Sequence, residues 1–184
     1  MIGVNIRLGG RLILEGLDLT VEEGECLALL GPSGCGKTTA GKAILRLLQP
    51  TAGGVFIEGT DLASLGDADL RARRKDFQII FQDPYSSLNP KQTIGEAILE
   101  PLLAHRLIKN RKDGSQKVYE VLEKVKLEKE SFYKFPHEFS GGQRQRIGIA
   151  SSLVIEPELI LADEPISALD VSIREQVLNL FRKF

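Results

Sequence analysis

The segment GPSGCGKTT, residues 31–39, determines how the rest of the sequence is interpreted. It fits the pattern G-x-x-x-x-G-K-[ST], in which glycines let successive backbone N–H groups converge on phosphate oxygens. The apolar run ECLALL precedes it, and TAGKAILRLLQP, whose apolar residues recur at helical spacing, continues from it to Pro50. The sequence therefore predicts a buried strand, a phosphate-binding loop and a helix, in that order.

Each part of this predicted loop has a chemical task. The ammonium group of Lys37 would reach the terminal phosphates, and the hydroxyl of Thr38 would bind Mg²⁺. The backbone N–H groups and the positive end of the helix would hold the phosphates themselves. The alternative is an ordinary glycine-rich turn, which the flanking strand and helix make the weaker interpretation. The candidate phosphate-binding residues are Gly31, Pro32, Ser33, Gly34, Cys35, Gly36, Lys37, Thr38 and Thr39.

Strands and helices are expected to alternate along the chain. The runs with strand character are GVNIRL and RLILEGLDLTV near the start, then GGVFIEG, FQIIFQ and PELILAD. Helical patterns cover residues 94–107, 115–126 and 171–184. Such an alternation predicts an α/β fold with a mostly parallel sheet, and the pair of helical patterns in the middle predicts a helical insert.

A second candidate site lies where the apolar run LILADEP, residues 159–165, ends in two carboxylates. Neighbouring strand residues point to opposite sides, so Asp163 could hold Mg²⁺ while Glu164 polarises the water that attacks a γ-phosphate. Gln82, which closes FQIIFQ, could bind the same Mg²⁺ and position water. The alternatives are a polar turn for the carboxylates and a surface amide for Gln82.

A third candidate site is FSGGQRQRIGIA, residues 139–150. Ser140 is a suitable N-cap for a helix beginning near Gln143, and Gly141 and Gly142 leave the free N–H groups of its first turn open to an anion. This segment supplies no lysine for phosphates and no ligand for a metal. It therefore looks like half of a nucleotide site.

Composition narrows the class of protein. The 184 residues fit one domain. The 24 basic residues nearly balance the 25 acidic ones, so the net charge gives the chain no general attraction to nucleic acid. The short cluster RARRK is interpreted as a solvated face. Cys26 and Cys35 lack metal or disulfide spacing, which favours a reducing cytoplasm. Because no apolar run approaches the ~20 residues that cross a bilayer, a membrane role would come through a partner.

Taken together, the phosphate loop, Gln82, SGGQ, LILADE and SALD resemble the ATPase subunit of an ABC transporter. The resemblance covers essentially the whole chain, and it implies a P-loop NTPase fold of ABC ATPase type with an antiparallel β part at the N-terminus. It also implies ATP and Mg²⁺ as cofactors. In that family two subunits pack head to tail, and each signature helix completes the site of its partner, which would explain the half site.

The resemblance assigns a role to each candidate residue. Glu164 and Gln82 would be catalytic, and Thr38, Gln82 and Asp163 would hold the metal. The residues that would act in trans on the nucleotide of the partner are Ser140, Gly141, Gly142, Gln143 and Asp170.

Two segments, FQDPYSSLNP and SALDVSI, are especially similar to the importers of oligopeptides, dipeptides and nickel. This similarity implies an energy-coupling ATPase on the cytoplasmic face of the cell membrane. Its partners would be a second ABC ATPase subunit, identical or paralogous, and transmembrane permease subunits. A substrate-binding protein would be an indirect partner, and no nucleic acid is expected.

The resemblance also suggests how the domain is organised. We expect residues 1–82 to form the nucleotide-binding core and β part, residues 83–138 a helical subdomain, and residues 139–184 the signature helix, acidic strand and final helix. The sequence ends at Phe184, before the strand and switch histidine that follow in the family, so a C-terminally shortened form is expected. Two alternatives stay open, namely a weakly active or non-catalytic nucleotide-binding module and a soluble ABC-type ATPase that acts on nucleic acid.

Overall fold

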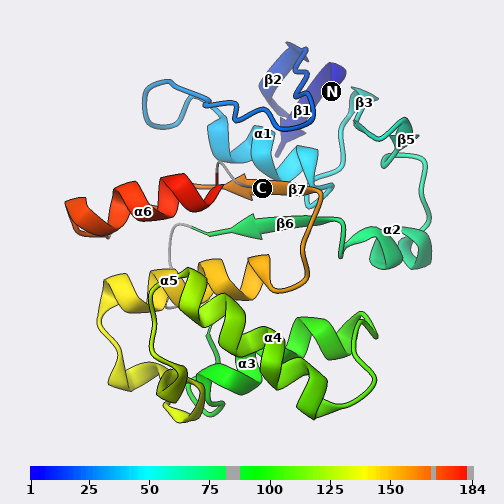
Figure 1. Ribbon diagram of the computed structural model, residues 1–184. Coiled ribbons are helices and arrows are strands. Elements are labelled where there is room, and N and C mark those ends of the chain that lie inside the picture. The colour runs from blue at the N-terminus through cyan, green and yellow to red at the C-terminus, as the bar shows by residue number, and fades with distance from the viewer. Residues whose placement is uncertain (82–87, 167–168, 182–184) are drawn as a thin grey trace. The chain divides into compact units, whose positions relative to one another are not determined.

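The computed structural model of the protein describes residues 1–81, 88–166 and 169–181 (Figure 1). The chain divides into two compact units, of which unit 1 is Met1–Arg74 and unit 2 is Lys75–Phe184. The predicted site residue Gln82, together with Ser167 and Ala168 of SALD, lies outside the described residues.

Unit 1 is built on a three-stranded antiparallel sheet. Its strands, in the order β2-β1-β3, are β1 (Ile2–Leu8), β2 (Arg11–Leu17) and β3 (Ala52–Gly54). Gly9 and Gly10 join β1 to β2 with φ values of 56° and 81°, and a tight hairpin favours this left-handed backbone at both positions. The side chains of Val4 and Ile6, both on β1, are fully buried. The expected antiparallel β part at the N-terminus is confirmed.

The remaining elements of unit 1 are short. They are α1 (Lys37–Ile44), β4 (Phe56–Ile57), β5 (Thr60–Asp61) and α2 (Asp67–Arg73). Helix α1 ends earlier than its apolar pattern because Arg46 has a left-handed backbone with φ 48°. The guanidinium of Arg74 donates to the carbonyl oxygens of Leu45 and Arg46, which follow the helix. Burial and the nearby charge of Arg46 lower the pKa of Arg74.

The strand predicted for ECLALL is not found. Residues 18–36 contain no strand, and Leu27, Leu29 and Leu30 are exposed, Leu30 to 92%. The apolar pattern shows that this segment can be buried, but a strand also needs a neighbour that accepts its backbone hydrogen bonds. None of the described strands pairs with residues 25–30.

Unit 2 contains a parallel strand pair. β6 (Phe77–Ile80) pairs with β7 (Leu159–Ala162), so that Phe77 lies opposite Leu159 and Ile80 opposite Ala162. The sequence predicts a mostly parallel sheet, and among the described residues β6 and β7 are the strands that pair in parallel. Helix α5 (Gly141–Leu153) runs beside β6, and the hydroxyl of Ser152 donates to the carbonyl oxygen of Ile79 at 3.3 Å (Figure 1).

The expected helical insert is present in unit 2 as α3 (Ile94–Ala104) and α4 (Arg111–Lys124), followed by two 3-10 helices, Lys129–Tyr133 and Pro136–Glu138. Helix α4 begins four residues before the predicted start. The side chain of Asn110 accepts a hydrogen bond from the N–H of Asp113 at 3.0 Å, and this N-cap extends the helix into the polar residues that precede the apolar pattern.

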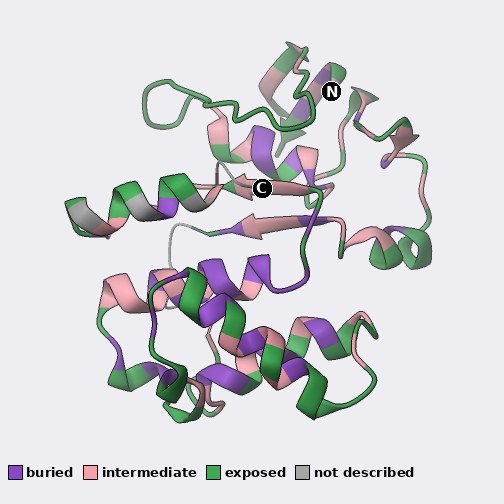
Figure 2. Ribbon diagram, viewed as in Figure 1, coloured by how far each residue is buried: buried purple, intermediate pink, exposed green. Residues whose placement is uncertain are grey.

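The largest core of the described residues lies where α3, α4 and α5 face one another, as the purple positions in Figure 2 show. Its fully buried members include Ile94, Ile98, Leu102, Val118, Leu122, Ile147 and Ile149. Val177 on the last helix, α6 (Val171–Phe181), also belongs to it. None of the described helices has the length and apolar character needed to span a membrane.

Candidate functional site

Two glycines fix the path of the predicted phosphate loop in unit 1. Gly36 is the N-cap of α1 with φ 102°, and a Cβ atom there would lie 2.9 Å from Cδ2 of Leu14. A Cβ atom on Gly31 would lie 2.7 Å from Sγ of Cys35. A side chain at either position would therefore have to displace the end of a neighbouring side chain. Gly36 also has a left-handed backbone, which glycine adopts without strain.

Lys37 folds back over this loop. Its Nζ donates to the carbonyl oxygens of Gly31 at 2.8 Å and Pro32 at 2.9 Å, and lies 3.9 Å from Sγ of Cys35. The ammonium group thus sits over residues 31–35, which are exposed and lead directly into the N-terminus of α1. A flexible cation beside an exposed glycine loop and a helix N-terminus suits a phosphate-bearing ligand.

The two predicted acidic residues in unit 2 follow β7 directly. The N–H of Asp163 donates to the carbonyl oxygen of Ile80 at 2.9 Å, which extends the parallel pairing by one residue. Asp163 is half-buried, and Glu164 is exposed with a left-handed backbone, φ 49°. A non-glycine residue in this conformation carries backbone strain, and such strain is common at functional sites.

The predicted metal ligands come from separate parts of the chain. Thr38 belongs to unit 1, Asp163 belongs to unit 2, and Gln82 lies outside the described residues. Within the described ranges no cluster of three histidine, cysteine, aspartate or glutamate side chains could hold a metal. The hydroxyl of Thr38 and the carboxylate of Asp163 are nevertheless hard oxygen donors, the chemistry that Mg²⁺ prefers.

The predicted N-cap of the signature helix is confirmed, and α5 begins at Gly141. The hydroxyl of Ser140 accepts from the N–H of Gln143 at 3.3 Å, and the side-chain oxygen of Gln143 accepts from the N–H of Ser140 at 2.8 Å. This capping box occupies the amides of Ser140 and Gln143. The donors of the first turn that an anion could use therefore belong to Gly141 and Gly142.

Asp170 lies at the start of α6 in unit 2. Its carbonyl oxygen accepts from the N–H groups of Ile173 at 3.0 Å and Arg174 at 2.9 Å, so its backbone forms the first turn of the helix. Its side chain is exposed and close enough to influence the guanidinium of Arg146 on α5. Unit 2 thus contains both elements that were predicted to act in trans.

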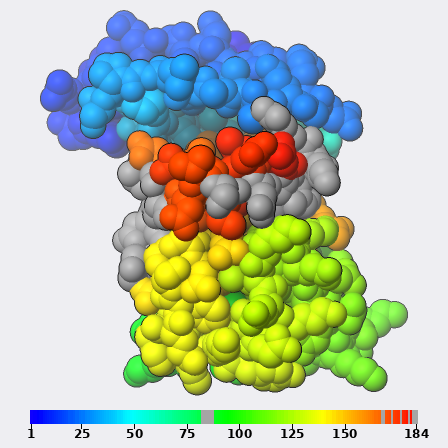
Figure 3. Space-filling view, turned by 60° about the vertical axis from the view of Figure 1, so that its left-hand side comes forward, coloured from blue at the N-terminus to red at the C-terminus, as the bar shows by residue number. Residues whose placement is uncertain are grey.

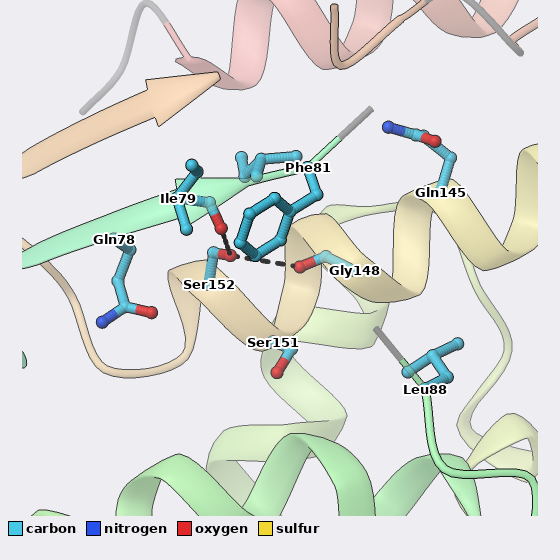
Figure 4. Close-up of a pocket in the computed structure, with 9 residues that line it drawn as sticks. Gln78, Ile79, Phe81, Leu88, Gln145, Gly148, Ser151 and Ser152 are labelled. Atoms are coloured by element: carbon cyan, nitrogen blue, oxygen red, sulfur yellow. Dashed lines mark hydrogen bonds between the residues drawn. The ribbon is translucent and has the colours of Figure 1, made fainter. Parts of the chain in front are cut away.

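A cavity of about 200 Å³ lies between β6 and α5 (Figure 4). The described residues that line it include Gln78, Phe81, Leu88, Gln145 and Ser151. Gln145 is 1% exposed, and its Oε1 is buried without a hydrogen-bond partner among the described residues.

The sequence predictions did not single out Gln145 or Arg146. Both lie in the polar run GGQRQR, residues 141–146, of which only the first residues carried a predicted role. The available signal was the position of the run inside a helix whose apolar pattern starts only at Ile147. Of the two, Arg146 donates to backbone carbonyl oxygens at the end of α4, whereas Gln145 lines the cavity.

Comparison with known proteins assigns the family. The profile of the family described as "ABC transporter" matches residues 14–167. The oligopeptide transport ATP-binding proteins OppF and AppF of Bacillus subtilis are 49% and 46% identical over 171 and 178 residues, or 92% and 96% of this chain. These matches cover 56% and 54% of the two relatives, so the chain spans about half of their length.

A solved structure is also similar. It is the dimeric, post-hydrolysis state of the ATP-binding cassette MJ0796 bound to ADP and Pi, with a TM-score of 0.89 and 32% identity. The match covers 99% of this chain and 80% of that one. The predicted α/β fold of ABC ATPase type is confirmed by this similarity. Since the family profile matches most of the sequence and a solved cassette matches nearly all of it, the chain belongs to the ABC transporter family.

Proposed function

We propose that the protein is the ATP-hydrolysing, energy-coupling subunit of an ABC importer for peptides. The observation that carries the proposal is the glycine loop of residues 31–39, with Lys37 placed over it at the start of α1. The names of OppF and AppF support peptides as the cargo class. Transport of nickel stays a prediction from the segments FQDPYSSLNP and SALDVSI.

ATP binding is proposed to use the loop in unit 1. Lys37 would exchange its contacts with the carbonyl oxygens of Gly31 and Pro32 for contacts with the terminal phosphates. The N–H groups of the loop would hold the remaining phosphate oxygens. Thr38 and Asp163, with Gln82, would bind Mg²⁺, which neutralises phosphate charge when present.

Hydrolysis is proposed to use Glu164 as the general base. Its carboxylate is exposed at the end of β7 and would accept a proton from the water that attacks the γ-phosphorus. The bond between that phosphorus and the bridging oxygen breaks, which leaves ADP and inorganic phosphate. Gln82 would orient the same water.

Head-to-tail pairing is proposed to complete each site. The Ser140–Gln143 turn has the two glycine amides to cap an anion but no cation of its own, so it would act on the nucleotide of a partner subunit together with Asp170. The dimeric structure of MJ0796 with ADP and Pi supports this arrangement by analogy. The partner would be an identical chain or a paralogue.

The membrane partner is proposed to be a permease. The relatives are named as transport ATP-binding proteins, and no described helix of this chain can span a bilayer. The protein would therefore bind peripherally to permease subunits at the cytoplasmic face of the membrane. A substrate-binding protein would deliver the peptide on the other side.

The test is nucleotide binding and phosphate release by the Lys37→Ala variant. We expect this change to abolish ATP binding, because it removes the cation that faces the phosphates. Lys42→Ala is the matched control, since Lys42 is an exposed lysine of the same helix. Unchanged ATP affinity in Lys37→Ala would contradict the proposal, and binding without phosphate release in the unaltered protein would favour a non-catalytic module.

A further inference from the structure

Arg146 joins two helices of unit 2. It lies on α5, six residues after the capping serine Ser140, and its Nη1 donates to the carbonyl oxygens of Val125 at 3.1 Å and Lys126 at 2.6 Å. These carbonyl groups follow the end of α4, where Lys126 has a left-handed backbone with φ 59°. A cation at this place stabilises the negative end of the helix.

The third helix near Arg146 is α6. A crevice of about 10 Å³ is lined by Arg146, by Lys124, Val125 and Lys126 at the end of α4, and by Ile173 and Val177 of α6. The space is at most large enough for about one water molecule, so it is not a ligand site. In the space-filling view, α6 in red lies next to the yellow and yellow-green surface of the α4–α5 region (Figure 3). Arg146 therefore stands at the junction of α4, α5 and α6.

One N–H group of the Arg146 guanidinium makes no hydrogen bond to the described residues. Its Nε is buried and has no hydrogen-bond partner among the described residues. Burial lowers the pKa of Arg146, and the carboxylate of Asp170 acts in the opposite direction by stabilising the charged form. Asp170 begins the helix that supplies Ile173 and Val177 to the same crevice.

We propose that Arg146 is a positioning residue that keeps Asp170 at a fixed separation from the Ser140–Gln143 turn. The two elements would then approach the nucleotide of a partner subunit as one body. This inference rests on the proposed head-to-tail dimer, but its first step, the packing of Arg146 against the first turns of α6, takes place within a single subunit.

The single-subunit step is tested by amide hydrogen exchange without nucleotide. The N–H groups of Ile173 and Arg174 donate to the carbonyl oxygen of Asp170, so they report on how firmly this turn is held. We expect faster exchange at both amides in Arg146→Gln, which removes the charge, and recovery in Arg146→Lys, which keeps it. Unchanged exchange in Arg146→Gln would overturn the inference, whether or not the protein forms a dimer.

The second step is tested by a double-mutant cycle in the Glu164→Gln background, where nucleotide persists. The dissociation constant of the Mg-ATP dimer is measured by sedimentation for Arg146→Gln, Asp170→Asn and the double variant. We expect each single change to weaken the dimer by about tenfold and the double change to add nothing further. If the two effects multiply instead, the residues act independently and the inference is wrong.

Lys126→Gln is the matched control for the cycle. It removes a positive charge from the same crevice but keeps the backbone carbonyl to which Arg146 donates. The factor by which Lys126→Gln changes the dissociation constant of the Mg-ATP dimer should multiply with the factor for Asp170→Asn. If the parent protein forms no Mg-ATP dimer, either alone or with a paralogous ATPase, the proposed head-to-tail pairing fails, and the exchange rates of Ile173 and Arg174 then decide the inference alone.

Discussion

At the scale of single residues, the candidate sites contain two closely packed glycines and a carboxylate with a left-handed backbone. A side chain at Gly31 or Gly36 would displace the end of the Cys35 or Leu14 side chain. Glu164 adopts the left-handed backbone that glycine would adopt more easily. Glu58 and Glu156 share this conformation outside the candidate sites, so the backbone of Glu164 supports a functional role only together with its position at the end of β7.

We predict that Gly36→Ala destabilises the protein more than Gly24→Ala. Both glycines have left-handed backbones, with φ values of 102° and 74°, so both changes carry a backbone cost of about 1–2 kcal/mol. A Cβ atom on Gly36 also meets Cδ2 of Leu14, whereas one on Gly24 meets no atom of the described residues within 4 Å. Displacing the end of the Leu14 side chain should therefore add a further, smaller cost for Gly36→Ala alone. Urea unfolding measures the difference, and equal losses would show that the contact with Leu14 does not matter.

Glu164→Gln should separate ATP binding from hydrolysis. The amide keeps the size of the side chain but cannot accept the proton of water, so we expect the rate of phosphate release to fall by about 10²–10⁴-fold with ATP affinity unchanged. Glu158→Gln is the control, because Glu158 is an exposed carboxylate just before the same strand. Full turnover in Glu164→Gln would show that another residue is the base.

At the scale of secondary structure, local chemistry predicted the elements that depend on their own residues. The N-cap of α5 could be predicted because Ser140 lies directly before the glycines that open the helix. The early start of α4 depends on Asn110 and Asp113, which precede the apolar pattern from which the helix was predicted. The strand expected for ECLALL was wrong because strand pairing depends on a distant partner, which an apolar pattern does not identify.

Two capping boxes allow the structural role of Ser140 to be separated from its proposed role at the nucleotide. Thr93 caps α3 with Glu96 in the same way that Ser140 caps α5 with Gln143. Replacing either residue by alanine should lower stability by about 1 kcal/mol, measured by urea unfolding. Only Ser140→Ala should also weaken the dimer formed with Mg-ATP. An equal effect of both changes on the dimer would remove the argument for a special role of Ser140.

At the scale of the whole molecule, the sequence predicted the family, while the assembly of the site from its parts stays a prediction. Five short segments in a fixed order were enough to indicate an ABC ATPase, and the family profile and the solved cassette agree. The phosphate loop lies in unit 1, while the acidic strand end and the signature turn lie in unit 2. Distances between these parts are tertiary properties, and no local pattern in the sequence specifies them.

The central claim is that the second glycine site binds the nucleotide of another subunit. The most direct test is light scattering on the Glu164→Gln variant with and without Mg-ATP, with Lys37→Ala added to the variant as a control that cannot bind nucleotide. We predict that Mg-ATP converts monomer to dimer in Glu164→Gln and leaves the control monomeric. A Glu164→Gln protein that binds Mg-ATP and stays monomeric, alone and when mixed with a paralogous ATPase, would contradict the claim.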